Sequence, residues 1–145
     1  MPDIFKCTYS FPLTQVPNVD WRGIANIAFA DVENHFTHER GPSGNWTNLK
    51  PATWARKTSP MMLYETGDYW ESWESTWDTS SAEVFSTSKL SMFHEYGTKV
   101  GGKKRMPKRQ IAYLSQRALR DLGHIFADAW IKGVFKDKNT TEVLT

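Results

Sequence analysis

The chain has 145 residues, the length of one ordinary domain, and we expect a single domain over residues 1–145. Hydrophobic residues make up 39% of it, with seven Trp, eight Phe and five Tyr, which is enough bulky apolar surface for a packed core and excludes a disordered chain. The single cysteine, Cys7, excludes an intrachain disulfide and a Cys-based zinc site. The sequence has no long apolar run and no signal-like N-terminus, so we expect no membrane contact and assembly in the cytoplasm.

Charged residues are segregated along the chain, although the net charge is only +2. Between residues 61 and 88 there are six acidic residues and no Lys or Arg, whereas the stretch from Lys89 to Arg120 is strongly basic. Such segregation favours contacts between copies of the chain, because the acidic part of one subunit can face the basic part of the next.

The first two predicted elements are a strand and a helix. Strand-favouring residues from Ile4 to Phe11 end at a proline, which predicts a short strand. Asp20 stands at an N-cap position, and the apolar residues after it recur at steps of three and four. This spacing predicts an amphipathic helix that runs to about His38.

A long connection and a β-hairpin follow this helix. Residues 41–60 hold three prolines and two glycines without periodicity, which predicts a long ordered loop. We expect three of its apolar side chains to attach it to the core: Trp46, Leu49 and Trp54. Trp73, Ser75 and Trp77 then alternate with polar residues, and a polar turn leads to a second short run through Val84 and Phe85. This pattern predicts a hairpin.

The last third contains a basic loop and the second long helix. Ile111 to Leu114 could form a further edge strand, and Ser115 can cap a helix that reaches about Phe135, followed by a polar tail over residues 136–145. The helix stripe comprises Leu119, Leu122, Ile125, Phe126, Ala129 and Trp130. The element order predicts an α+β fold, in which a small antiparallel β-sheet packs with two main α-helices and a long ordered loop.

Neither metal binding nor catalysis is favoured by the titratable residues. His35 and Glu39 lie four apart with His38 beside them, but no third ligand accompanies them, and a solvated helix end explains them as well. The His94-Glu95 pair has no Ser or Cys nucleophile in a recognisable motif. We therefore expect hydrogen-bonded structural residues here, no cofactor and no enzymatic activity.

The basic loop after His94 offers a contact surface. Gly101-Gly102 before three basic residues does not match the spacing of a phosphate-binding P-loop. What remains is a flexible loop that contacts either a partner protein or, without sequence preference, the DNA backbone. The residues expected to make this contact are Lys99, Lys103, Lys104 and Arg105.

Three tryptophans suggest an alternative function. Trp70, Trp73 and Trp77 lie at steps of three and four, so they could form a platform on which sugars or bases stack. Core or interface positions are the commoner use of Trp. An aromatic-rich binding module for cell-wall glycan or nucleic acid stays open as the alternative.

Several short motifs combine into a family resemblance. After the helix that ends near Phe36 come Gly41-Pro42-Ser43-Gly44 with Trp46 and Leu49, Thr53 with Arg56-Lys57, Leu63-x-x-Thr66-Gly67-x-Tyr69-x-x-Ser72, His94-Glu95-Tyr96-Gly97 and Met106-Pro107-x-Arg109. In this order they resemble the bacteriophage virion-morphogenesis family, the tail-completion proteins of contractile-tailed, Mu-like and P2-like phages. The resemblance covers about Asp20 to Leu114. It departs from the family pattern at Leu90–Phe93, ahead of the His, and at Gln110-Ile111, after the Arg.

The resemblance implies a non-enzymatic virion protein at the head-tail joint or the upper end of the tail. It implies a ring, commonly of six subunits, around the DNA channel, in contact with tail tube, sheath or head-connector proteins. Within the motifs, Gly67 and Gly97 suit turns that need positive φ, a ring hydrogen bond of His94 to the backbone can hold such a turn, and Pro107 can fix the chain as it leaves the basic loop. The motif residues expected to matter for structure or interface are Gly67, Ser72, His94, Gly97, Pro107 and Arg109.

Overall fold

The computed structural model describes residues 5–9 and 18–142, with side chains from residue 18 to residue 132. Its elements confirm the predicted α+β class, with small antiparallel sheets and two main helices. In chain order they are β1 (Phe5–Tyr9), α1 (Trp21–His38), β2 (Arg40–Gly41), β3 (Gly44–Asn45), α2 (Pro51–Trp54), α3 (Asp68–Glu71), β4 (Trp73–Trp77), β5 (Ala82–Ser86), α4 (Leu90–Tyr96), β6 (Thr98–Val100), β7 (Lys103–Met106) and α5 (Gln116–Glu142).

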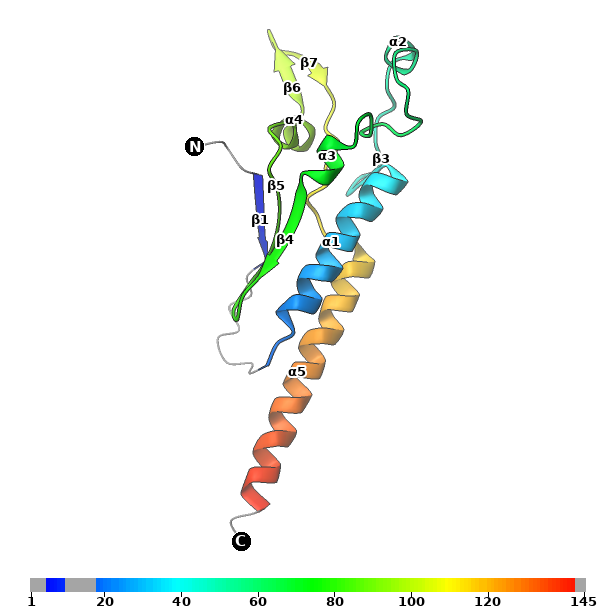
Figure 1. Ribbon diagram of the computed structural model, residues 1–145. Helices are drawn as coiled ribbons and strands as arrows, with labels where there is room; N and C mark the ends of the chain where they lie inside the picture. Colours follow the sequence, from blue (N-terminus) through cyan, green and yellow to red (C-terminus); the bar gives the residue numbers. More distant parts are fainter. Residues whose placement is uncertain (1–4, 10–17, 143–145) are drawn as a thin grey trace.

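Helix α1 lies at the centre of the molecule, between the main sheet and α5 (Figure 1). The sheet has the order β1-β5-β4 with antiparallel pairing throughout, and α1 packs against β4 and β5. Asp20 is the N-cap as predicted, because its Oδ1 accepts a hydrogen bond from the backbone N–H of Gly23 at 2.9 Å. The helix ends at Glu39, which adopts the left-handed conformation with φ of 52°.

The predicted hairpin is confirmed as β4 and β5, with Trp73 opposite Ser86 and Trp77 opposite Ala82. Alternate residues of β5 are buried, as one face of an antiparallel sheet requires. The larger of two core clusters joins α1 to this sheet and to later segments. Its buried members are Ala28, Val32, Phe36, Trp46, Tyr69, Trp73, Val84 and Ile111.

Helix α5 runs antiparallel to α1 and continues past the N-terminal end of α1 (Figure 1). The second core cluster fixes this pair, because Leu122 packs with Ile24 and Ala25 of α1, and Trp21 meets Phe126 edge-on at 6.2 Å between ring centroids. The helix reaches Glu142 rather than about Phe135, so part of the predicted polar tail is helical.

The structure differs from several of the elements predicted from the sequence. The region 41–60 is not one loop, since it contains the β2–β3 pair and the short helix α2. Trp46 is buried in the core, but Leu49 and Trp54 are only partly buried. In the helix stripe of α5, Leu119 and Trp130 are exposed. The first strand is confirmed over Phe5–Tyr9, while the rest of its predicted span lies outside the described residues.

Candidate functional site

The segment from Pro107 to Ser115 returns the chain from the β6–β7 hairpin to α5 without regular structure. The predicted edge strand at Ile111–Leu114 is therefore wrong. Instead of a neighbouring strand, side chains from α1 and α4 satisfy the backbone of this return segment. Buried backbone groups need partners, and here they find them in three buried ionisable side chains, which are Asp31, His35 and Glu95.

Glu95 of α4 holds the start of the return segment. Its Oε1 accepts hydrogen bonds from the backbone N–H groups of Ile111 at 2.7 Å and Ala112 at 2.9 Å. The side chain is only 4% exposed, and this burial raises the pKa of the carboxyl, an effect that the two N–H donors offset only in part. Two bonds to successive N–H groups fix the direction of the chain at Ile111, the most deeply buried residue of the segment.

Asp31 and His35, one helical turn apart on α1, hold the other end. Asp31 accepts hydrogen bonds from both the backbone N–H and the hydroxyl of Ser115, at 2.7 and 2.6 Å. His35 Nε2 donates to the carbonyl oxygen of Tyr113 at 3.0 Å, lies 3.3 Å from Asp31 Oδ2, and its ring stacks on Tyr113. Burial acts to raise the pKa of Asp31, but hydrogen bonds from His35 and Ser115 outweigh it and lower that pKa. Ser115 caps α5 as predicted, since its hydroxyl accepts from the N–H of Ala118.

His94 and Arg109 also take part in the contacts of the return segment. The ring hydrogen bond to the backbone that the sequence predicts for His94 is not among these contacts. His94 lies inside α4 rather than in a turn, and its ring Nδ1 is buried without a hydrogen-bond partner in the part of the chain that the structure describes. The backbone makes the contact instead, because the carbonyl oxygen of His94 accepts from the N–H of Arg109 at 2.7 Å. Burial, assisted by the nearby Arg109 charge, lowers the pKa of His94 to about 4, so the ring is neutral at pH 7.

Arg109 ties the return segment to the loop before α2. Its guanidinium donates to the carbonyl oxygen of Thr47 at 2.9 Å, and the side chain is 3% exposed. Burial lowers the pKa of Arg109, while the charge of Glu39 partly opposes that shift. The guanidinium is thus buried and bonds to the backbone of its own chain, although its Nε has no hydrogen-bond partner among the described residues.

A serine cluster joins the hairpin to α4. Ser72 bonds both to the carbonyl oxygen of Tyr69, at 2.6 Å, and to Ser86 Oγ, at 2.8 Å. Ser91 of α4 donates to the same Ser86 hydroxyl at 2.6 Å, and both Ser86 and Ser91 have no exposed surface. The motif residue Ser72 is thus one of three hydroxyls that fix α4 against the sheet.

The two motif glycines have the backbone conformation that the sequence predicts. Gly67 precedes α3 with φ of 95°, and Gly97 ends α4 with φ of 70°. At Gly97 a side chain would also collide with the backbone, since an added Cβ would lie 2.7 Å from the carbonyl oxygen of Met106. The close approach of β7 to the end of α4 therefore requires glycine.

The predicted flexible basic loop is an ordered hairpin. Strands β6 and β7 pair as antiparallel neighbours, and Gly101 and Gly102 form the two-residue turn with positive φ at both positions. Four of its cationic side chains are exposed, and among the described residues none of the four forms a hydrogen bond or ion pair. They are Lys99, Lys103, Lys104 and Arg105, the residues predicted for a contact.

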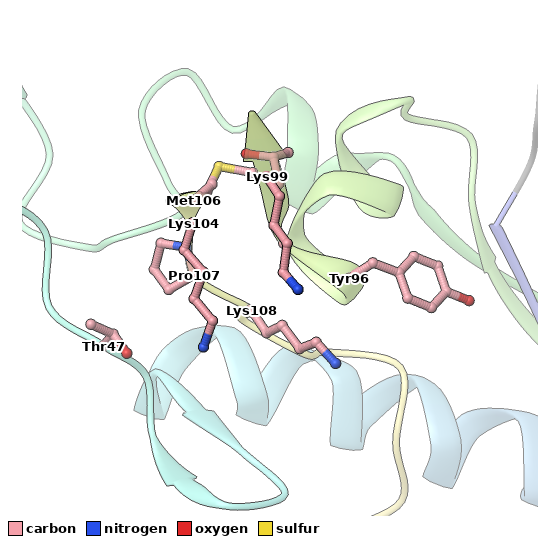
Figure 2. Close-up of a pocket in the computed structure, with 9 residues that line it drawn as sticks. Thr47, Tyr96, Lys99, Lys104, Met106, Pro107 and Lys108 are labelled. Atoms are coloured by element: carbon pink, nitrogen blue, oxygen red, sulfur yellow. The ribbon is translucent and has the colours of Figure 1, made fainter. Parts of the chain in front are cut away.

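A shallow pocket of about 470 Å³ lies between this hairpin and the end of α4 (Figure 2). Its lining includes Thr47, Gly97, Pro107 and three lysines, with no Asp or Glu. Figure 2 shows the amino groups of these lysines on the same side of the pocket, whereas the ring of Tyr96 points away from it. The three are Lys99, Lys104 and Lys108. A concave surface with only positive charge can hold an anionic group such as phosphate or carboxylate.

Helix α4 exposes its apolar side and buries its polar side. At 100° per residue, Leu90, Met92, Phe93 and Tyr96 fall in one arc and are 37% to 60% exposed. The opposite arc holds Ser91, His94 and Glu95, which face the interior through the contacts described above. An ordinary surface helix has the reverse arrangement, so the outer side of α4 is a candidate contact surface.

Trp70, Trp73 and Trp77 do not lie together on one exposed face, as the alternative of an aromatic binding platform would require. Trp73 is 3% exposed in the core, and Trp70 stacks on Phe36 with 5.0 Å between ring centroids. Only Trp77 of these three is half exposed, with Arg22 above its ring. Sequence reasoning also overlooked Asp31 and Ser86. A signal for both was present in the sequence, because Asp31 is a polar residue on the core side of the predicted amphipathic helix and Ser86 is a polar residue at a core position of a strand.

The described residues offer no group of three or more His, Cys, Asp or Glu side chains that could hold a metal ion. Among the helices described, none combines the length and apolarity needed to cross a membrane. Comparison of the chain with family models, with curated proteins and with solved structures found no match.

Proposed function

We propose that this protein is a structural component of a phage virion, located at the head-tail joint. In this role it is a tail-completion, tail-terminator or neck protein that forms a ring, commonly of six copies, and is needed for head-tail joining. It is assembled in the host cytoplasm and has no enzymatic activity. The proposal begins from the motif resemblance between Asp20 and Leu114 and from the roles that the motif residues have in the fold.

The arrangement of the His94-Glu95 motif is the observation that carries the proposal. Glu95 binds two backbone N–H groups, and Arg109 binds a backbone carbonyl. These ionisable groups stabilise the fold, while the same helix presents apolar side chains to the outside. Internal polar bonds with an external apolar face favour a subunit of an assembly over a catalyst.

The position of the basic hairpin supports the same role. The hairpin projects from one end of the molecule, and α5 extends from the other (Figure 1). Exposed cations on a projecting hairpin suit a contact with a neighbouring subunit of the assembly. The exposed Trp130 and Ile131 on α5 provide a second apolar region.

Contact with DNA in the channel is a second candidate for the hairpin, favoured by the lysine pocket. Replacing Lys99, Lys104 and Lys108 by alanine tests it. If the pocket holds DNA phosphate, the variant should bind duplex DNA more weakly at low salt. The slope of log affinity against log salt concentration should also become shallower by roughly 0.9 for each phosphate that the variant no longer neutralises. Unchanged DNA affinity at both low and high salt would remove this candidate.

Deletion of the gene from the phage that carries it tests the main proposal. We expect separate filled heads and tails in electron micrographs of the lysate, and joining restored by the wild-type chain supplied from a plasmid. Antibody labelling of intact particles should mark the region between head and tail. Normal yields of joined, infectious particles from the deletion phage would contradict the proposal.

A further inference from the structure

We infer that the outer side of α4 and the β6–β7 hairpin form one docking surface for a second copy of this chain, which binds it through the acidic residues Asp68, Glu71 and Glu74. The inference deepens the proposed function, because it names the surfaces through which the subunits of a ring would join. It rests on exposure, charge and pairing in the described residues.

The docking surface combines two kinds of exposed group. Its apolar part is the outer arc of α4 together with Val100 of β6, which is 59% exposed. Its charged part is the set of four cations on the hairpin directly after α4, for which no hydrogen bond or ion pair exists among the described residues. The hairpin follows α4 directly in the chain and rises from the end of that helix in Figure 1, so the two elements that carry these groups adjoin each other in the fold. An apolar centre with a charged rim is the usual composition of a protein interface.

The chain itself carries a complementary surface. Of the six acidic residues between 61 and 88, Glu65 is paired with Lys57, and Asp78 accepts hydrogen bonds from Ser80 and Ser81. Three others, on α3 and β4, are exposed and have no ion pair in the part of the chain described; they are Asp68, Glu71 and Glu74. The acidic and cationic surfaces come from different elements, so each copy offers both halves of the contact.

Complementarity of charge selects a second copy over another occupant. Within the described residues, the hairpin has no counter-charge from its own subunit, and the three carboxylates of α3 and β4 have none either. A contact between copies brings both sets together and covers the apolar arc of α4 at the same time. Surface patches that differ but complement each other make a head-to-tail contact, which closes into a ring when the rotation permits.

Two charge-reversal variants and their mixture test this contact. One variant carries Lys103→Glu, Lys104→Glu and Arg105→Glu, and the other carries Asp68→Lys, Glu71→Lys and Glu74→Lys. Each variant should raise the Kd of self-association, measured by sedimentation velocity, about tenfold or more. The reason is that three exposed ion pairs together contribute about a factor of ten to the Kd. An equimolar mixture should restore assembly, because every contact in an alternating complex again joins opposite charges.

A matched control has the same change in charge on α5: Arg117→Glu, Arg120→Glu and Lys132→Glu. It should assemble as the wild type does, and circular dichroism should show all variants folded. The apolar part is tested separately by Phe93→Ser, which removes a 47% exposed ring and should weaken assembly without loss of fold. High salt should weaken the wild-type assembly gradually.

Several outcomes would overturn the inference. A wild-type chain that is monomeric up to about 100 μM, a mixture that fails to reassemble, or a loss of assembly in the α5 control and not in the hairpin variant would each do so. Binding of the hairpin to duplex DNA by a monomeric wild type would assign the surface to nucleic acid instead. If self-association fails but the gene is still required for head-tail joining, this inference and the proposed ring fall, while the role in head-tail joining stands. If assembly occurs but joining is normal without the gene, the proposed function falls.

Discussion

Replacement of Glu95 by alanine should destabilise the protein strongly, whereas replacement by glutamine should not. In Glu95→Ala the N–H groups of Ile111 and Ala112 lose their acceptor in a buried place. An unpaired buried donor costs about 1 to 3 kcal/mol, so with two such donors the free energy of unfolding should fall by about 2 to 6 kcal/mol. For a domain of this length that corresponds to a decrease in Tm of about 4 to 24 °C.

Glutamine keeps an oxygen at the same position, so Glu95→Gln should cost less than about 1 kcal/mol at pH 7. The pH dependence separates the charge from the hydrogen bonds. Burial raises the pKa of Glu95 above 4.5, so the folded protein favours the protonated form, and the stability from this group decreases as the pH rises through the folded pKa. The stability of the Gln variant relative to the wild type should therefore increase from pH 4.5 to pH 8.

Urea unfolding followed by tryptophan fluorescence measures these differences, with Glu33→Ala on α1 as the control for loss of an exposed carboxylate. Equal stability of the alanine and glutamine variants at Glu95 would refute the reasoning. Such a result would mean that the return segment does not depend on this acceptor.

Three further predictions concern the same structure. The pKa of His94 is lowered from 6.5 to about 4 in the fold, so stability should decrease as the pH falls between these values, by about 2 to 3 kcal/mol, and His94→Gln should flatten that decrease in urea titrations at several pH values. Gly97→Ala should cost about 2 to 4 kcal/mol in thermal unfolding, because it combines a positive φ with a backbone clash, and Gly101→Ala, in open space, should cost less. Asp31→Ala should lower the free energy of unfolding by about 2 to 4 kcal/mol, because two hydrogen bonds from Ser115 disappear. Hydrogen exchange should then show faster opening at the start of α5. Unchanged protection there would contradict the role of Asp31 as an anchor.

The sequence by itself determined the elements whose signals are local. Helix α1 begins at an Asp whose side chain caps it, and its apolar spacing places Ile24, Ala28 and Val32 in the core. The β4–β5 hairpin follows from alternation and a polar turn, and the positive φ of Gly67 and Gly97 from the need for glycine in such turns. Each of these depends on residues a few positions apart, so the sequence contains the whole physical cause.

Only the tertiary structure decided the conformation of the return segment and which side of α4 is buried. Residues 111–114 have the composition of a strand, but they do not pair with one. The backbone N–H of Ile111 bonds to Glu95, 16 positions away, and the carbonyl oxygen of Tyr113 bonds to His35, 78 positions away. No local pattern encodes a partner at that distance. Helix α4 is inverted for the same reason, since Ser91 and Glu95 find buried hydrogen-bond partners in β5 and the return segment. Partners supplied by the fold thus hold these polar side chains inside, and the apolar side of the helix is left outside.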